Sequence, residues 1–242
     1  MNEIRRLDAA AATSASGDAR QAFDAIPWLS RSIAEDAASG RFARWSRSTI
    51  IDENVGNPVL DRAVFDRLHD LAGEPSAWPV GNAGVLHVYG YLLSLTPTPY
   101  GLKRERWLGP ELARAFGLAD DAFAPWSDGP TLLERVTGAA TGLLHSPAAS
   151  RTEAGGEYVT ALSASAGRAA LVYARVTEDG IRLVTTFPVA DAAAVLTAID
   201  AQVPVSAIAK TLTDGFGGTL AGVALLVALG AMLGRLIEHS GG

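Results

Sequence analysis

The densest group of basic side chains lies in the segment Tyr100-Gly-Leu-Lys-Arg-Glu-Arg-Trp107. Lys103, Arg104 and Arg106 stand close together there, next to an indole. A guanidinium can hold a carboxylate or a phosphate through two parallel hydrogen bonds, and a lysine adds a point charge. We interpret this cluster as a candidate site for a small anion. The alternative is a solvated loop and helix start that the tryptophan anchors.

A second candidate lies in the apolar run 80–95, VGNAGVLHVYGYLLSL, which contains His87, Tyr89 and Tyr91. In a β-strand these alternate residues would share one face, and an imidazole titrates near neutral pH. The three side chains could therefore form a site, or His87 could be a core histidine whose nitrogens are hydrogen-bonded. The run is 16 residues long and contains polar groups, so we expect a buried helix or a strand pair.

The sequence contains no recognisable motif for a metal or an organic cofactor. His69 and His145 are isolated, no HxH or HExxH spacing occurs, and there is no cysteine, so we expect no metal site and no cysteine catalysis. Gly81-Asn-Ala-Gly84 lacks the GxGxxG spacing of a dinucleotide site, and neither a P-loop nor a GxSxG elbow is present. We expect no cofactor, and the sequence leaves open whether the chain is an enzyme.

Charge is distributed unevenly along the 242 residues, whose formal net charge is −6. An acidic chain is not suited to displace the counterions of a nucleic acid, so we expect no nucleic-acid partner. The apolar run at residues 9–12 is too short for a secretory signal, so we expect residues 1–200 to lie in the cytoplasm. After residue 200 the charged residues are Lys210, Asp214, Arg235 and Glu238.

The elements that would position these candidates form an α+β pattern, with helices first and an antiparallel β meander after them. Residues 1–20 resemble a frayed tail or a weak helix. Apolar periodicity predicts helices over residues 21–25, 29–38, 42–45, 61–71, 109–116 and 131–144, and a last one over 191–199. Thr131 with Glu134 resembles a capping box, and Asp191 is a candidate N-cap.

Three β-rich segments occupy residues 157–162, 169–177 and 181–187. The last two flank Glu178-Asp179-Gly180, and Asp-Gly between alternating apolar runs is a strong hairpin signal. Thr185 and Thr186 precede Phe187-Pro188 at the end of a predicted strand, from which they could reach a pocket.

The segment 216–234, FGGTLAGVALLVALGAMLG, has 19 residues and no charge. A helix of that length spans about 28 Å, close to the hydrocarbon thickness of a bilayer. The alternative is a fully buried core helix. Small residues recur at the four-residue step that lets two membrane helices approach closely, which suggests a homo-oligomer. These packing residues are Gly218, Gly222, Gly230 and Gly234.

The same end of the chain carries two ordered motifs, Gly215-Phe-Gly-Gly-Thr-Leu-Ala-Gly222 and Leu229-Gly-Ala-Met-Leu-Gly-Arg-Leu-Ile-Glu-His-Ser-Gly-Gly242. They resemble the gluconate permease family of proton-coupled sugar-acid symporters over residues 204–242. Such proteins have a similar glycine-rich entry, a GAMLG turn of helix, and an acidic residue shortly before Ser-Gly-Gly. The resemblance implies a lipid bilayer and a sugar acid or other small anion as partners, and it covers none of residues 1–200.

Two functional hypotheses follow for a chain divided into an α+β domain, 1–202, and one membrane-helix segment, 203–242. The first is a fragment or fusion related to a gluconate transporter and held in the cell membrane by its C-terminal helix. The second is an enzyme or ligand-binding domain for a small anionic metabolite, in which that helix is only an anchor or a fusion artefact. Family members have many membrane spans, so we expect that one span does not transport gluconate by itself.

Overall fold

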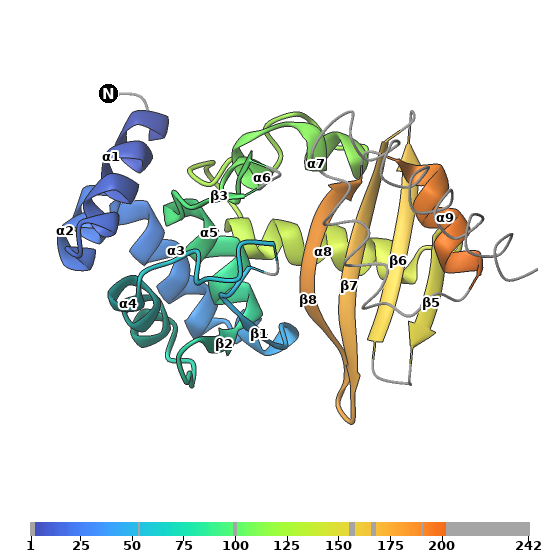
Figure 1. The fold of residues 1–242 in the computed structure, drawn as a ribbon, viewed down its shortest axis with the longest axis horizontal. Helices are drawn as coiled ribbons and strands as arrows, with labels where there is room; N and C mark the ends of the chain where they lie inside the picture. Colours follow the sequence, from blue (N-terminus) through green and yellow to red (C-terminus); the bar gives the residue numbers. More distant parts are fainter. Residues whose placement is uncertain are drawn as a thin grey trace, which may run out of the picture.

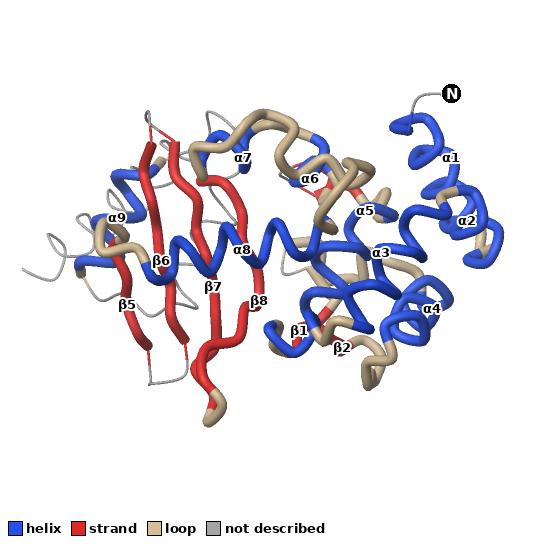
Figure 2. The backbone as a smooth tube through the Cα atoms, turned by 180° about the vertical axis from the view of Figure 1, so that it is seen from behind, coloured by secondary structure: helices blue, strands red, loops and turns tan. Residues whose placement is uncertain are grey.

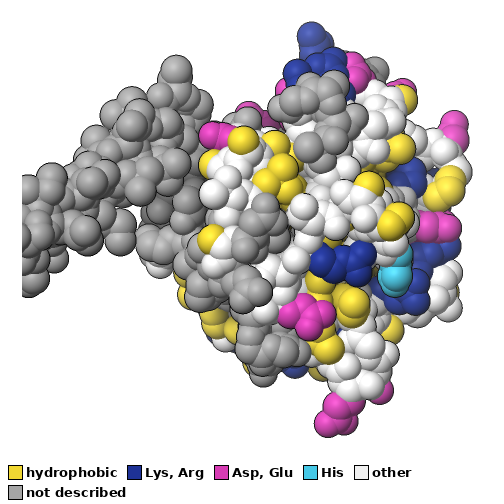
Figure 3. All heavy atoms as spheres, turned by 90° about the vertical axis from the view of Figure 1, so that its right-hand side faces the viewer, with side chains coloured by type: hydrophobic (Ala, Val, Ile, Leu, Met, Phe, Trp, Pro, Cys, Tyr) yellow, Lys and Arg dark blue, Asp and Glu magenta, His cyan; other side chains and the backbone are white. Residues whose placement is uncertain are grey.

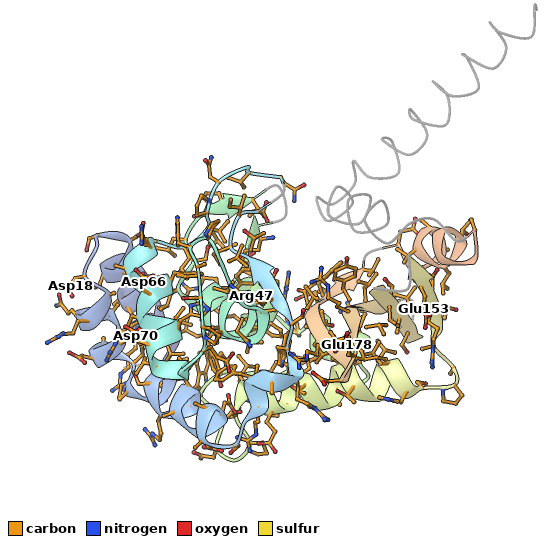
Figure 4. All side chains as sticks on the ribbon, turned by 90° about the horizontal axis from the view of Figure 1, so that it is seen from below. Asp18, Arg47, Asp66, Asp70, Glu153 and Glu178 are labelled. Carbon is orange, nitrogen blue, oxygen red and sulfur yellow. The ribbon has the colours of Figure 1, made fainter. Side chains whose placement is uncertain are left out.

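A computed structural model places the helices of the first half beside an antiparallel sheet formed by the second half (Figure 1). It describes residues 3–52, 54–98, 101–154, 158–165, 168–189 and 191–201. The helix expected over 216–234, with its packing residues Gly218, Gly222, Gly230 and Gly234, lies outside the described residues. Seen from below, Asp18, Asp66 and Asp70 lie on the helical side and Glu153 and Glu178 on the sheet side (Figure 4).

The helical part is built around a cluster of buried apolar side chains. Its first element forms a packed helix where only a tail or a weak helix was expected, because Leu7, Ala10 and Ala11 are fully buried. The fourth helix ends at Gly73, whose φ of 63° suits a glycine. The elements are α1 (Glu3–Ala15), α2 (Ala19–Ala25), α3 (Pro27–Ala38), η1 (Arg41–Arg44), α4 (Arg62–Ala72), the π-helical η2 (Gly84–Gly90) and α5 (Tyr91–Leu93).

Two small antiparallel strand pairs and two short helices lie among or directly after the helices of the first half. The strand β1 (Arg47–Thr49) pairs with β2 (Val80–Asn82), and β3 (Pro97–Thr98) pairs with β4 (Gly101–Leu102). The helices α6 (Glu105–Leu108) and α7 (Glu111–Ala115) follow. Because α6 begins inside the basic cluster, the side chains of that cluster leave the backbone in different directions.

The sheet has four antiparallel strands in sequence order, β5 (Ser150–Ala154), β6 (Tyr158–Ser165), β7 (Arg168–Thr177) and β8 (Gly180–Val189). The first of them was not predicted. The helix α8 (Leu132–His145) crosses one face of the sheet (Figure 2), and α9 (Ala192–Asp200) lies on the other face, against β5 (Figure 1). Both start at the predicted caps, where Thr131 accepts from the Glu134 amide at 3.1 Å and Asp191 from the Ala194 amide at 2.9 Å.

A β-bulge at Val184 decides which side chains of β8 face which way. Tyr173 pairs with Thr185 and Ala174 with Leu183, so Val184 has no partner on β7. Leu183 therefore joins the core shared with α8, whereas Phe187 joins the smaller apolar cluster under α9. An extra residue in one strand shifts the alternation in this way.

Among the residues that the structure describes, no helix combines the length and the apolar character needed to cross a membrane.

Candidate functional site

A cavity of about 470 Å³ lies where the helical part meets β7 and β8. Its size falls within the range of small-molecule sites in proteins. The walls come from β1 and the loop after it, η2 and α5, the segment from β3 to α7, and the face of the sheet that carries α9. The polar and aromatic lining residues are Ser48, Thr49, Asp52, His87, Tyr91, Thr98, Lys103, Glu105, Arg106, Glu111, Tyr173, Thr185 and Phe187.

His87 connects η2 to the bulged strand. Its Nδ1 lies 2.7 Å from the carbonyl oxygen of Val184, the residue that the bulge leaves without a ladder partner. Burial and the charge of Arg106 lower the pKa of His87 to about 3, despite that hydrogen bond. The imidazole is therefore neutral at physiological pH, and Nδ1 must carry the proton that it donates to Val184. His87 stacks on Tyr91, with ring centroids 4.9 Å apart.

Arg106 places its guanidinium among aromatic rings at the cavity wall. The carbon Cζ lies 5.2 Å from the ring centroid of Tyr91, 5.7 Å from that of Phe187 and 5.9 Å from that of Trp107. Burial lowers the pKa of Arg106, but a guanidinium stays charged at neutral pH. Nη1 donates to the hydroxyl of Thr185 at 2.9 Å. No carboxylate among the described residues forms an ion pair with Arg106.

Lys103, the second cation of the cavity, forms an ion pair with Asp52. Burial raises the pKa of Asp52, but the hydrogen bond and charge of Lys103 outweigh it and lower this pKa below its ordinary value. The backbone amides of Asn54 and Val55 add hydrogen bonds of 2.9 and 3.1 Å. The pair is nearly buried, with 13% of Lys103 and 4% of Asp52 exposed, so the charge of Lys103 is largely compensated within the protein.

The remaining acidic residues of the cavity, Glu105 and Glu111, are exposed at its rim. Glu105 accepts a hydrogen bond from the Leu102 amide at 3.1 Å. Elsewhere, acidic, basic and hydrophobic side chains are interspersed, as on the described surface of the face in Figure 3. The cavity differs from that surface because a half-buried guanidinium lies among aromatic rings in its wall.

The predicted site residues divide into two groups. His87, Lys103 and Arg106 meet at the cavity, as does Thr185. Arg104 turns away and forms an ion pair of 2.7 Å with Asp8 of α1.

Tyr89 is likewise absent from the cavity lining, because residues 84–93 are helical rather than extended. In a helix, positions four apart share a face, so His87 meets Tyr91. Tyr89 instead points into the helical core and donates to the buried carboxylate of Asp36. Thr186 also turns inward, with a 2.8 Å bond to the Leu171 carbonyl.

Asp52 and Phe187 are the two most important of the cavity residues that were missed in the sequence. In the sequence Asp52 looks like a turn residue whose carboxylate accepts from nearby backbone amides. Its ion pair with Lys103 joins segments that are far apart in the sequence. Phe187 was seen only as the end of a strand. Neither residue carried a signal in the sequence that pointed to the cavity.

Metal ligation finds no support in the described part of the chain, where no three His, Asp or Glu side chains gather in a way that could hold an ion. The cavity instead offers a cation, aromatic faces and hydroxyl groups, which suit an organic anion.

Comparison with known proteins concerns the other end of the chain. Residues 183–242 match the family model of the GntP family permeases. The C-terminal segment is similar to gluconate permeases. It is 59% identical over 39 residues to a gluconate permease of Bacillus licheniformis, covering 16% of this chain and 9% of the relative. The inner membrane permease YgbN of Escherichia coli is 49% identical over 47 residues, 19% of this chain and 10% of the relative.

The chain thus spans about a tenth of the length of these curated relatives. A gluconate permease of Pseudomonas aeruginosa gives a similar match, 54% identical over 39 residues, 16% of this chain and 9% of the relative. No solved structure is detectably similar to this chain. The family match starts at residue 183, inside β8, so its first part is a strand and a helix of the sheet domain, and its remainder lies outside the described residues.

Proposed function

We propose that residues 3–201 form a binding domain for a small carboxylate, with Arg106 as its anchor. The observation that carries this proposal is the guanidinium itself, which lies half-buried in the cavity wall and, among the described residues, is bonded to a neutral hydroxyl rather than to a carboxylate. Charge-assisted bonds from arginine to a carboxylate are among the strongest in proteins. Tyr91 and Phe187 hold the guanidinium in place, so little rotational freedom is lost when a ligand binds.

The test is a thermal-shift series on the full chain in mild detergent, with acetate, phenylacetate, gluconate and phosphate at matched ionic strength. A ligand that binds only the folded state raises the free energy of unfolding by about 2.7 kcal/mol at a hundred times its Kd. At least one carboxylate should raise the Tm, and Arg106→Gln should abolish the effect. The matched control is Arg182→Gln, because Arg182 lies on β8 and pairs with Asp179 at 2.8 Å. Equal shifts in both variants would refute the proposal.

A second function is favoured by the C-terminal match. We propose that residues 203–242 place the chain in the cell membrane, with residues 1–200 on the cytoplasmic side, as a fragment or fusion related to a gluconate transporter. The support is the family match together with the uncharged run 216–234 in the sequence. Two of the relatives named above are called gluconate permeases, so gluconate is the first sugar acid to test.

Fractionation of cells that express the chain tests this second proposal. The full chain should stay in the membrane pellet after extraction at alkaline pH, whereas a variant that ends at residue 202 should be released. Release of both forms would exclude a membrane-spanning segment.

A further inference from the structure

Apolar atoms supply most of the exposed surface of the cavity around Arg106. Leu171 and Phe187 come from the sheet face that carries α9, and Leu112 comes from α7. β1, the loop after it and β4 also line the cavity. The full apolar lining is Ile51, Leu102, Leu112, Leu171, Val184, Phe187 and Pro188, with the rings of Tyr91 and Tyr173.

Three hydroxyl groups of the cavity form hydrogen bonds within the protein. Thr98 donates to the Gly101 carbonyl at 2.8 Å, and Thr185 accepts from Arg106. Thr49 accepts from the Ile51 amide at 3.2 Å and lies 3.5 Å from the Pro79 carbonyl oxygen. A ligand with many hydroxyl groups would bury some of them without partners, and each such group costs about 1–3 kcal/mol.

The charges set the number of carboxylates that the cavity accepts. Lys103 is paired with Asp52, so one cation, Arg106, remains for a ligand among the described lining residues. Glu105 and Glu111 stand at the rim, where they would repel a second negative group.

We propose that the ligand of this cavity is a monocarboxylate with an apolar body, either an aromatic ring or a branched alkyl group. The inference rests on the carboxylate site proposed above and narrows its ligand class. The carboxylate accepts two hydrogen bonds from Arg106, and the apolar body packs against Leu171, Leu112 and Phe187. Sugar acids fit this cavity less well because some of their hydroxyl groups would be buried without partners. Dicarboxylates fit less well because Arg106 is the one cation left for a ligand among the described lining residues.

Equilibrium dialysis of the full chain in mild detergent tests the inference with labelled phenylacetate, gluconate and succinate. Phenylacetate should bind at least about tenfold more tightly than the other two, and Arg106→Gln should weaken it at least about tenfold. Arg182→Gln in the same detergent corrects for uptake by the micelles. Ile51→Asn, at a cavity residue that is 38% exposed, should weaken phenylacetate several-fold without unfolding the protein.

The outcomes separate this inference from the proposed function. If gluconate or succinate binds as tightly as phenylacetate and still depends on Arg106, the carboxylate site stands and the apolar ligand class is wrong. If no carboxylate binds in an Arg106-dependent way, both proposals are wrong. Unchanged phenylacetate affinity in Ile51→Asn would also count against the apolar wall as a binding surface.

Discussion

The hydroxyl of Tyr89 belongs to the helical core rather than to the cavity. It donates to Asp36, which is fully buried and also accepts from Thr131 at 2.6 Å and from Arg41 at 3.0 Å. We expect Tyr89→Phe to lower the free energy of unfolding by about 1–2 kcal/mol, because one donor to a buried carboxylate is lost. Its carboxylate affinity should equal that of the unsubstituted chain. Urea titration and equilibrium dialysis check both, and weaker binding by a stably folded variant would place Tyr89 in the site.

His87 should make stability depend on pH. Its folded pKa of about 3 lies below the unfolded value of about 6.5, so the unfolded chain takes up the proton first as the pH falls. The contribution of His87 is therefore complete above pH 6.5 and is lost between about 6.5 and 3, at up to about 1.4 kcal/mol per pH unit. His69, whose pKa burial also lowers, acts with the same sign.

Asparagine at position 87 can keep a donor for Val184 but does not titrate. In urea titrations at pH 7, 6 and 5, the His87→Asn variant should lose stability less steeply than the unsubstituted chain. His145→Asn is the comparison, because His145 is exposed at the end of α8. Parallel pH profiles for His87→Asn and the unsubstituted chain would show that His87 is not held neutral by burial.

At the scale of elements, the pairing of β1 with β2 depends on a close approach at Gly81. A Cβ there would lie 2.1 Å from Nε2 of His69, the atom that accepts from the Asn82 amide. We expect Gly81→Ala to destabilise the protein by about 1–3 kcal/mol, because the ring is buried and must move. Gly138→Ala is the matched control. It meets nothing within 4 Å on α8 and should stabilise by about 0.5–1 kcal/mol. Equal melting temperatures for the two variants would contradict this account.

Elements with local causes could be predicted from the sequence. The caps at Thr131 and Asp191 and the turn before Gly180 depend on residues a few positions apart, and the structure has them in place. The bulge at Val184 could not be predicted, because a strict alternation would have put Leu183 and Phe187 on one face. The bulge depends on contacts of β8 with elements far away in the sequence. These are the pairing with β7 and the hydrogen bond that His87 of η2 donates to Val184.

The candidate site follows the same division. Arg106 and Lys103 were found by residue type, but the direction of each side chain depends on where α6 starts. Arg104 was indistinguishable from them in the sequence, and only the packing of α1 against this segment gives it Asp8 as a partner. Tyr89 was grouped with His87 because the sequence allowed either a strand or a helix for residues 80–95. A strand would place His87 beside Tyr89 on one face, whereas a helix places it beside Tyr91.

At the scale of the whole molecule, residues up to Val195 already form two apolar clusters. Val195 of α9 is buried against the sheet with Leu162 and Leu171. We expect residues 1–202 to fold without the C-terminal segment and to melt in one cooperative transition, followed by circular dichroism. A variant that ends at residue 179 should not melt cooperatively, since it lacks β8 and Phe187 of the smaller cluster. Aggregation of 1–202 would show that the C-terminal segment completes the core.

Transport is the property in which this chain should differ from the permeases that it resembles. The family match covers residues 183–242, and its first part is built into the sheet as β8 and α9. The sequence that remains offers one uncharged run of spanning length, 216–234. Secondary transporters form their substrate and ion sites between several helices near the bilayer midplane, and a single helix provides no second wall for such a site.

We therefore expect vesicles that contain only this purified chain to take up no labelled gluconate under an imposed proton gradient, although the chain is retained in the bilayer. In the sequence, Arg235 and Glu238 stand three positions apart at one end of the run, where on a helix they could pair with each other at the interface. Vesicles with the Bacillus licheniformis gluconate permease are the positive control, and a proton ionophore is the control for gradient dependence. Saturable uptake that the ionophore abolishes would contradict the expectation, and would mean that copies assemble through Gly218, Gly222, Gly230 and Gly234 into a pathway.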